Sequence, residues 1–534
     1  MKNGFDKIGV MIDCSRNAVP NVKTLKLFID NLAKMGYNRL ELYTEDTYEI
    51  KNRPYFGYLR GRYSGTELKE IDAYASGRGI ELTPCIQVLA HLNQIFRWPA
   101  FAGLRDCNDI LLVDEPETYK LIEDMFASVA ENFTSRNINI GCDEAFMVGL
   151  GKFFDRFGYQ NRFEIINRHI GRVLKIAEKY GFKCAMWSDM YFRLAFGGEY
   201  ADTAKSIPPE VLERIPQNIS LIYWDYYSTD NEHYRKMFAG HKKIGNEIEF
   251  AGGAWKWQGF APDNLYSINT AKAAVPAARE YGIKKIMVAA WGDNGAETSL
   301  FAVLPTLFYF ARLCRGKSVE PAELEKGFRK IAGTGFEEFM DIELVKGRSR
   351  RAYERNGSAE KALLYCDYFC GVFDTWVTDK AEYYKTVAQK LKIGKYGKFS
   401  YIFKTMRLLA EILELKTDIG VRTRALYRAG DKAGLKELVG EYIIIAKRIE
   451  TFYKEFQSQW MRENKPHGFE VQDLRIGGLI RRTRSCHDRL LQYCAGRLDA
   501  VSELDEDILH YTPDNTEDPL VHNSHTVTVS VNVI

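Results

Sequence analysis

The sequence has little of what marks several specialised classes of protein. No apolar run approaches the roughly 18 uninterrupted residues of a membrane-spanning helix, so we expect no membrane partner. The 74 Lys and Arg residues nearly balance the 71 Asp and Glu residues, and the formal net charge of +3 disfavours nucleic acid as a partner. With 42 Gly and 15 Pro among 534 residues, and 46% hydrophobic residues, the composition is globular rather than collagenous or of low complexity.

Signals for secretion and for bound metals are also scarce. The apolar run at 8–12 is too short for the core of a signal peptide, and Asp13 and Arg16 follow it, so we expect a cytoplasmic protein. The ten cysteines are scattered, and the CxxxC pair, Cys366 and Cys370, has no second pair that would complete a zinc site. We therefore expect reduced thiols, no metal and no cofactor.

Short apolar runs alternate with longer amphipathic stretches over the first 315 residues. Several of the helical patterns end in Gly just before the next run, as a left-handed helix cap would: Gly36, Gly79, Gly181 and Gly282. The runs, which we expect to be strands, cover residues 8–13, 39–45, 81–89, 137–145, 183–191, 219–227, 247–257 and 284–293.

Eight strands, each followed by a helix, are typical of an α/β protein with a (β/α)8 TIM barrel. A doubly wound open sheet normally carries a Gly-rich phosphate turn after its first strand, whereas residues 13–17 here read Asp-Cys-Ser-Arg-Asn. We therefore predict a barrel over residues 1–315. Residues 316–510 carry periodic apolar positions on charged helical patterns, which predicts an α-helical C-terminal domain. The tail at 511–534 fits either an edge strand or a loose end.

Acidic and aromatic residues gather where the predicted strands end. The active site of a (β/α)8 barrel forms at the C-terminal ends of its strands. Indole rings stack on the apolar faces of sugars and carboxylates pair with hydroxyls, so this composition indicates a sugar-binding pocket. From the first strand to the eighth, the residues are Asp13, Arg16, Glu45, His91, Asp143, Glu144, Trp187, Trp224, Tyr226, Trp255, Trp257, Trp291 and Asp293.

The pair Asp143-Glu144 is the most informative feature, because it follows a short apolar run at the tip of the fourth strand. Two neighbouring carboxylates at a strand tip can reach different atoms of one substrate. Their proximity and partial burial would raise the pKa of one and leave the other ionised, as a general acid and its electrostatic partner require. An Asp-Glu pair is otherwise usually solvated surface, which is what we expect of Asp114-Glu115.

The segment at 140–144, Ile-Gly-Cys-Asp-Glu, resembles the fourth-strand signature of glycoside hydrolase family 20, the β-N-acetylhexosaminidases. Residues 13–16 are similar to the first-strand motif of that family, 43–46 to the second and 89–91 to the third, in the family's order. Glu45 stands where Asp is usual, and Asp293 where Glu is usual. The resemblance covers about residues 8–500. It implies a divergent bacterial branch without the α/β domain that precedes the barrel in many members.

The resemblance implies an exo-acting retaining β-N-acetylhexosaminidase that hydrolyses terminal β-linked GlcNAc or GalNAc by substrate-assisted catalysis. The substrate's 2-acetamido oxygen would attack the anomeric carbon and form an oxazolinium intermediate. Glu144 would act as acid and then as base, Asp143 would hold the acetamido N–H, and Tyr226 (or Tyr227) would donate to its oxygen. The other implied contacts are Arg16 at the 3- and 4-hydroxyls, His91 with Glu45 behind the acid, Trp187, Trp224, Trp255, Trp257 and Trp291 around the sugar, and Asp293 at a hydroxyl.

Three other interpretations stay open at this point. A metal-dependent barrel hydrolase would need a cluster such as His-x-His, and none of the nine histidines is so arranged in the barrel region. A glycan-binding protein without turnover, or a retaining glycosidase with a protein nucleophile, would share the same pocket. The expected partner is an N-acetylhexosamine-terminated oligosaccharide or glycoconjugate. The preference for GlcNAc or GalNAc is open, as is whether the helical domain closes the cleft or forms a homodimer face.

Overall fold

The computed structural model describes residues 4–202, 205–347, 357–377, 379–514 and 516. Eight parallel strands form a closed barrel in sequence order, and the first strand pairs with the last. The predicted (β/α)8 fold is therefore confirmed. The strands are β1 (Lys7–Asp13), β2 (Arg39–Tyr43), β3 (Glu81–Cys85), β4 (Asn137–Asn139), β5 (Lys183–Trp187), β6 (Ser220–Trp224), β7 (Ile248–Gly253) and β8 (Lys285–Ala290).

Most of the strands are shorter than the apolar runs that predict them, and β4 differs most. The run at 137–145 was expected to be one strand, but β4 ends at Asn139. Gly141 and Cys142 then adopt left-handed backbone conformations, with φ of 74° and 68°, which turns the chain out of the sheet. Ile140, Cys142 and Ala145 are nonetheless buried. The apolar pattern therefore reflects burial of the turn rather than a longer strand.

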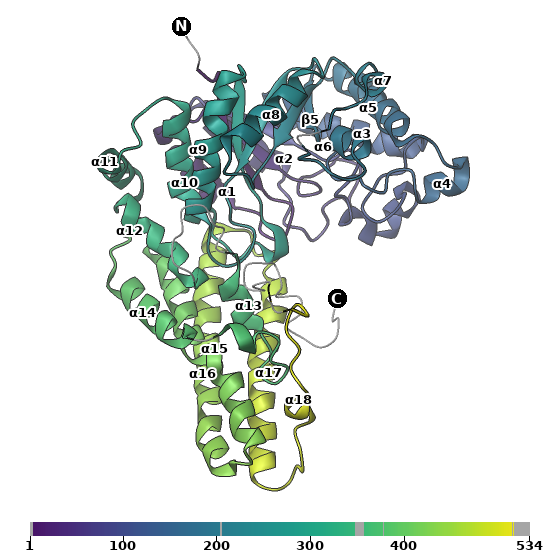
Figure 1. The fold of residues 1–534 in the computed structure, drawn as a ribbon. Coiled ribbons are helices and arrows are strands. Elements are labelled where there is room, and N and C mark those ends of the chain that lie inside the picture. Colours follow the sequence, from purple (N-terminus) through teal and green to yellow (C-terminus); the bar gives the residue numbers. More distant parts are fainter. Residues whose placement is uncertain (1–3, 203–204, 348–356, 378, 515, 517–534) are drawn as a thin grey trace. The chain divides into compact units, whose positions relative to one another are not determined.

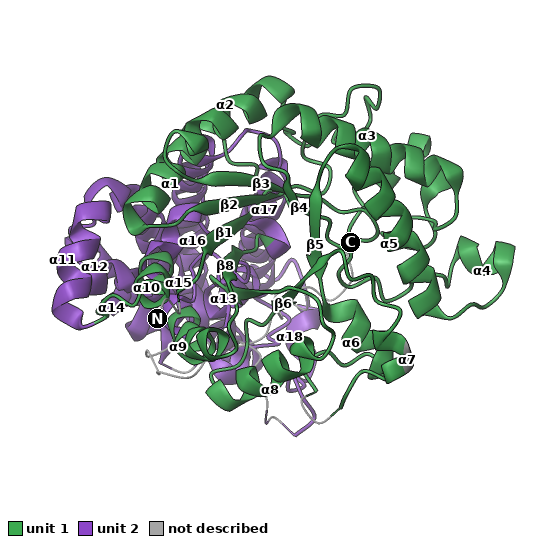
Figure 2. Ribbon diagram, turned by 90° about the horizontal axis from the view of Figure 1, so that it is seen from above, with its two compact units in different colours: residues 1–254, 267–292, 306–319 green, residues 255–266, 293–305, 320–534 purple. Residues whose placement is uncertain are grey.

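Helices follow the strands around the barrel, and Figure 2 shows α2, α3, α5 and α8 outside the labelled strands. The glycines expected to cap helices, at 36, 79, 181 and 282, all have positive φ. Gly36 caps α1 as predicted, whereas the cap residues of α2 and α5 are Gly77 and Tyr180, one or two residues earlier. The helices are α1 (Val22–Met35), α2 (Gly65–Ser76), α3 (Pro116–Asn132), α4 (Lys152–Phe157), α5 (Arg162–Lys179), α6 (Asp189–Ala195), α7 (Pro209–Leu212), α8 (Asn231–Lys242), α9 (Asn264–Glu280) and α10 (Leu304–Cys314).

The C-terminal part of the chain is helical, as the periodicity predicts. Its longest helices, α15, α16 and α17, pack side by side (Figure 1). Arg422 of α15 joins α16 through a bidentate ion pair with Glu441, at 2.9 and 2.6 Å. The helices are α11 (Pro321–Ala332), α12 (Phe336–Met340), α13 (Ala359–Tyr365), α14 (Lys380–Ile393), α15 (Ser400–Arg428), α16 (Lys432–Glu463), α17 (Glu470–Cys494) and α18 (Ser502–Asp505). Among the described residues, none of the helices is long and apolar enough to cross a membrane.

The chain divides into two compact units, which Figure 2 colours green and purple. Unit 1 comprises residues 1–254, 267–292 and 306–319 and contains the whole barrel. Unit 2 comprises residues 255–266, 293–305 and 320–534. It thus takes in the segments after β7 and β8, which the single boundary expected near residue 315 does not include. Most of the tail, 515 and 517–534, lies outside the described residues, so its expected structure stays a prediction.

A cluster of buried charges lies inside the barrel in unit 1. Arg39 of β2 forms ion pairs with Glu41 on the same strand and, at 2.7 Å, with Glu249 of β7. All three residues are buried. Burial raises the pKa of Glu41 to about 7, although Arg39 opposes the shift. Removing one partner of such a buried pair leaves an uncompensated charge in a medium of low dielectric constant.

We expect Arg39→Met to destabilise the barrel by about 3–5 kcal/mol near pH 8, because Glu41 then loses its cation, whereas Glu249 keeps Lys285 at 3.2 Å. The pKa of Glu41 lies above its unfolded value, so its protonated form favours folding at low pH and this contribution is lost as the pH rises through about 7. The variant's deficit in unfolding free energy should therefore be smaller at pH 5. Urea unfolding at both pH values tests this. Lys26→Met, which breaks an exposed pair with Glu70, is the control and should change the midpoint little.

Candidate active site

Asp143 lies just beyond the end of β4 and is held from two sides. Gln87, two residues beyond β3, donates from Nε2 to Asp143 Oδ1 at 2.6 Å. His91 Nε2 lies 3.3 Å from Asp143 Oδ2. Burial alone would raise the pKa of Asp143, but the charge of His91 and the hydrogen bonds from His91 and Gln87 outweigh it and hold that pKa below its usual value. Asp143 is therefore a buried, ionised carboxylate.

His91 is correspondingly cationic. Burial lowers the pKa of an imidazole, but Asp143 and Glu45 outweigh that effect and raise the pKa of His91 to about 10. Asp109 Oδ2 accepts a hydrogen bond of 2.9 Å from the His91 backbone N–H and so fixes the main chain at His91. The three groups Glu45, His91 and Asp143 thus come together from the ends of β2, β3 and β4.

Glu144 occupies a different environment from its neighbour Asp143. Its side chain is 40% exposed, whereas that of Asp143 is 11% exposed. Glu144 Oε2 lies 3.8 Å from His91 Nε2, and its backbone has φ of 51°. A residue in this conformation directs its side chain differently from one in a strand, which allows two adjacent carboxylates to face one substrate. Asp143 is thus enclosed and ionised, whereas Glu144 is open enough to exchange a proton with another group.

The turn that carries the pair depends on Gly141. An added Cβ there would lie 2.1 Å from Gln87 Oε1, so no other side chain fits without displacing Gln87. That oxygen accepts the Cys142 backbone N–H at 3.1 Å. Gln87 therefore holds both the backbone of the turn and the carboxylate of Asp143. Sequence reasoning missed Gln87; its one signal is a polar residue inside the buried apolar run at 86–90.

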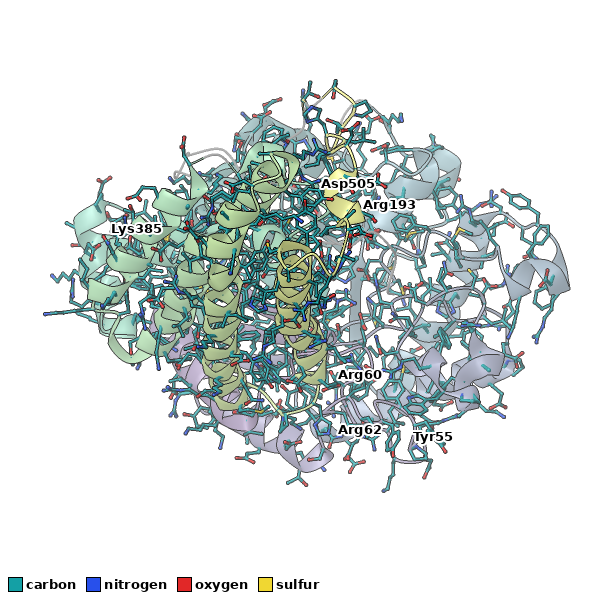
Figure 3. All side chains as sticks on the ribbon, turned by 90° about the horizontal axis from the view of Figure 1, so that it is seen from below. Tyr55, Arg60, Arg62, Arg193, Lys385 and Asp505 are labelled. Atoms are coloured by element: carbon teal, nitrogen blue, oxygen red, sulfur yellow. The ribbon has the colours of Figure 1, made fainter. Side chains whose placement is uncertain are left out.

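Arg16, at the end of β1, is fixed by two carboxylates. Its Nη1 lies 3.0 Å from Glu45 Oε1, and its Nε lies 3.6 Å from Asp13 Oδ2. The side chain of Arg60, labelled in Figure 3, donates to the backbone carbonyls of Ser15 and Arg16. Burial raises the pKa of Glu45 to about 7, opposed by Arg16 and His91. The guanidinium is thus held in place while its side chain remains 28% exposed.

Four of the predicted aromatic residues meet within unit 1. Trp291, after β8, lies 4.7 Å from Tyr43 and 6.1 Å from Trp187 between ring centroids. Trp291 also forms a side-chain hydrogen bond with the buried Tyr226, whose ring stacks 5.3 Å from that of Trp224. Burial raises the pKa of Tyr226 well above its usual value, so the phenol is protonated. Tyr227, the other residue considered for this role, is 53% exposed.

The remaining predicted residues belong to unit 2. Trp255 and Trp257 stack on each other at 4.2 Å, and Tyr266 packs against Trp255. Asp293 begins a short segment whose next residues are fastened to α13 and α17. Lys361 and Arg475 each donate to the Asn294 carbonyl at 2.7 Å. The roles expected of Trp255, Trp257 and Asp293 toward a sugar stay predictions.

The part of the chain that the structure describes contains no preformed metal-binding site. Among the described residues, no group of three or more His, Cys, Asp and Glu side chains is arranged to hold a metal ion. Cys142, next to the carboxylate pair, is buried, and burial raises the pKa of its thiol well above the usual value. A neutral, buried thiol is a packing group rather than a nucleophile.

Two family comparisons agree with this arrangement. Residues 5–250 match the family described as "Glycosyl hydrolase family 20, catalytic domain". Residues 335–523 match the family described as "Glycoside Hydrolase 20C C-terminal domain". The chain belongs to glycoside hydrolase family 20. It is therefore a glycoside hydrolase, and the resemblance inferred from the strand-end motifs is confirmed.

Individual relatives are distant. Hexosaminidase D of Bos taurus is 24% identical over 270 residues, which is 48% of this chain and 71% of that protein. Hexosaminidase D of Homo sapiens is 25% identical over 260 residues, which is 45% of this chain. The match covers 49% of that protein, so this chain spans about half of its length. A β-hexosaminidase of Akkermansia muciniphila is 28% identical over 171 residues, 26% of this chain and 34% of that protein. The solved GH20 exo-β-N-acetylglucosaminidase of Vibrio harveyi is 16% identical, with a TM-score of 0.48, covering 66% of this chain and 60% of that one.

The pairing of His91 with Asp143 can be tested by titration. In Asp143→Asn, we expect the pKa of His91 to fall from about 10 toward the usual value of about 6.5, because the largest opposing charge is gone while burial remains. Histidine-selective NMR as a function of pH measures the change. His169, whose pKa burial lowers to about 4, is the internal control and should not move. A His91 that stays charged above pH 9 in the variant would show that Asp143 is not the cause.

Proposed function

We propose that this chain is an exo-acting retaining β-N-acetylhexosaminidase, which releases terminal β-linked GlcNAc or GalNAc by substrate-assisted catalysis. The observation that supports this most strongly is the difference in environment between two adjacent carboxylates. Asp143 is buried, ionised and engaged at both oxygens, whereas Glu144 is half-exposed beside it. One group is suited to hold a fixed negative charge and the other to exchange a proton with a substrate.

The engagement of Asp143 argues against a protein nucleophile. Glycosidases with a protein nucleophile use a second carboxylate whose oxygen attacks the anomeric carbon. Asp143 Oδ1 accepts from Gln87 and Oδ2 pairs with His91, so neither oxygen is poised to form a covalent bond. A carboxylate retains further lone pairs in this state and can accept one more hydrogen bond. An acetamido N–H is a suitable donor, and its neighbouring oxygen can then serve as the nucleophile.

The proposed reaction proceeds in two steps. In the first, Glu144 gives its proton to the glycosidic oxygen while the acetamido oxygen bonds to the anomeric carbon, so the leaving group departs as an alcohol. Asp143 accepts the acetamido N–H and stabilises the positive charge that develops on the oxazolinium ring. In the second, Glu144 removes a proton from water, whose oxygen bonds to the anomeric carbon and opens the ring. The two inversions retain the β configuration.

In this proposal, the residues around Asp143 and Glu144 bind the terminal sugar. Arg16 is clamped by Glu45 and Asp13, which suits it to hold the vicinal 3- and 4-hydroxyls of a pyranose. Trp187, Trp291 and Tyr226 supply an aromatic wall for the ring and the acetamido methyl group. Tyr226 is the better candidate than Tyr227 for the contact with the acetamido oxygen, because it is buried against Trp291.

Kinetics with nitrophenyl β-glycosides test the proposal. We expect hydrolysis of the GlcNAc or GalNAc derivative and none of the glucoside, because glucose lacks the acetamido nucleophile. Asp143→Asn and Glu144→Gln should each lower kcat by about 100-fold or more. A thiazoline analogue of GlcNAc should inhibit, since it mimics the cyclic intermediate.

Two outcomes would contradict the proposal. Cleavage of the glucoside as fast as of the N-acetyl sugars, with no inhibition by the thiazoline, would indicate a protein nucleophile. Binding of GlcNAc without turnover of any N-acetylhexosaminide would indicate a glycan-binding protein.

A further inference from the structure

Arg193 lies beside the side chain of Glu144, although no strand-end motif includes it. It belongs to α6, in the crossover between β5 and β6, and is labelled in Figure 3. Arg193 Nη2 lies 3.7 Å from Glu144 Oε1, whereas His91 Nε2 lies 3.8 Å from Glu144 Oε2. Each carboxylate oxygen of Glu144 therefore faces a different cation.

Arg193 is held firmly at this position. Its Nε donates to Asp189 Oδ2 at 3.1 Å, and its Nη1 donates to the Gly198 carbonyl at 3.1 Å. Three aromatic rings surround the guanidinium, with centroid distances of 4.9 Å to Phe146, 5.5 Å to Tyr200 and 5.8 Å to Trp224. The side chain is only 17% exposed. A guanidinium that is already held by a carboxylate and by aromatic rings loses little further conformational entropy when it contacts a neighbouring side chain. It can therefore orient that side chain at a small entropic cost.

Asp189 also holds the backbone of Glu144. Its Oδ2 accepts the Glu144 backbone N–H at 3.1 Å, in addition to the bond from Arg193. Asp189 is fully buried, and its other oxygen has no hydrogen-bond partner among the described residues. Burial, together with the charge of Asp143, raises the pKa of Asp189 to about 7. A single carboxylate thus ties the first turn of α6 to the main chain of Glu144, where φ is 51°.

We propose that Arg193 is a positioning residue for Glu144 and that Asp189 anchors both. This inference rests on the proposed function, in which Glu144 serves as acid and then as base. Arg193 fixes the direction of the Glu144 carboxyl group and favours its ionised form, which the second step requires. The charged groups that flank Glu144 include His91 from the β3 loop, its neighbour Asp143, and Asp189 and Arg193 from α6.

Arg193→Met is the informative variant, tested on N-acetylhexosaminides with two leaving groups. A methoxyphenol is a poor leaving group and depends on proton donation, whereas a dinitrophenol departs with little help. We expect kcat/KM for the methoxyphenyl substrate to fall about 10- to 100-fold and that for the dinitrophenyl substrate to change much less. The alkaline limb of the kcat/KM profile should move to higher pH, because the group that favours the ionised carboxylate is gone.

Two further variants distinguish a role of Arg193 in positioning Glu144 from a role in the stability of the fold. Arg193→Lys keeps the charge, so it should preserve the wild-type alkaline limb while recovering only part of the rate. Arg172→Met is the matched control, since Arg172 also combines a carboxylate partner, Asp114 at 3.1 Å, with an aromatic ring, Tyr119 at 4.7 Å. It should behave as wild type. Thermal unfolding of each variant shows whether it is folded.

Equal losses on both substrates with an unmoved pH profile would show that Arg193 is merely structural. A raised KM with unchanged kcat would show that it binds the aglycone. Either result overturns the inference while leaving the proposed function intact. A Glu144→Gln variant with wild-type rates would overturn the proposed function, and this inference with it.

Discussion

The buried ion pair between His91 and Asp143 is the interaction on which the candidate site depends. It keeps Asp143 ionised in a place where burial alone would neutralise it, and it keeps His91 charged in a place where burial alone would discharge it. His91 also faces Glu144, and its charge acts on Glu45. The positive charge of one imidazole therefore favours the ionised form of three carboxylates, those of Asp143, Glu144 and Glu45. Gln87 supports the pair by holding both Asp143 and the turn that carries it.

The barrel explains why residues so far apart in sequence meet here. Parallel strands in sequence order bring the ends of β1 to β4 together, and the short β4 places its carboxylates at the start of a turn. Arg16 is then paired with Glu45, and His91 with Asp143, while the charge of His91 also acts on Glu45. Pairs of this kind hold the functional groups of a site in place.

Much of this could be predicted from sequence. The alternation of apolar runs and amphipathic stretches predicts eight strands. Residues at or just beyond the ends of those runs include Arg16, His91, Asp143, Glu144 and the aromatic residues. Gln87 and Arg193 could not be found in this way. Each contacts a residue from another segment of the chain, and neither residue belongs to one of the strand-end motifs. The end of β4 at Asn139 could not be predicted either, because a buried turn has the same apolar pattern as a strand.

Four residues of the site, Glu45, His91, Cys142 and Glu144, adopt the left-handed conformation that non-glycine residues rarely occupy. Each costs the folded state of the order of 1 kcal/mol that a glycine would not. Glycine at 45, 91 or 144 would relax the backbone but remove the carboxylate or imidazole group at that position. Under the proposed function, stability and activity therefore make opposite demands on the residues at these positions.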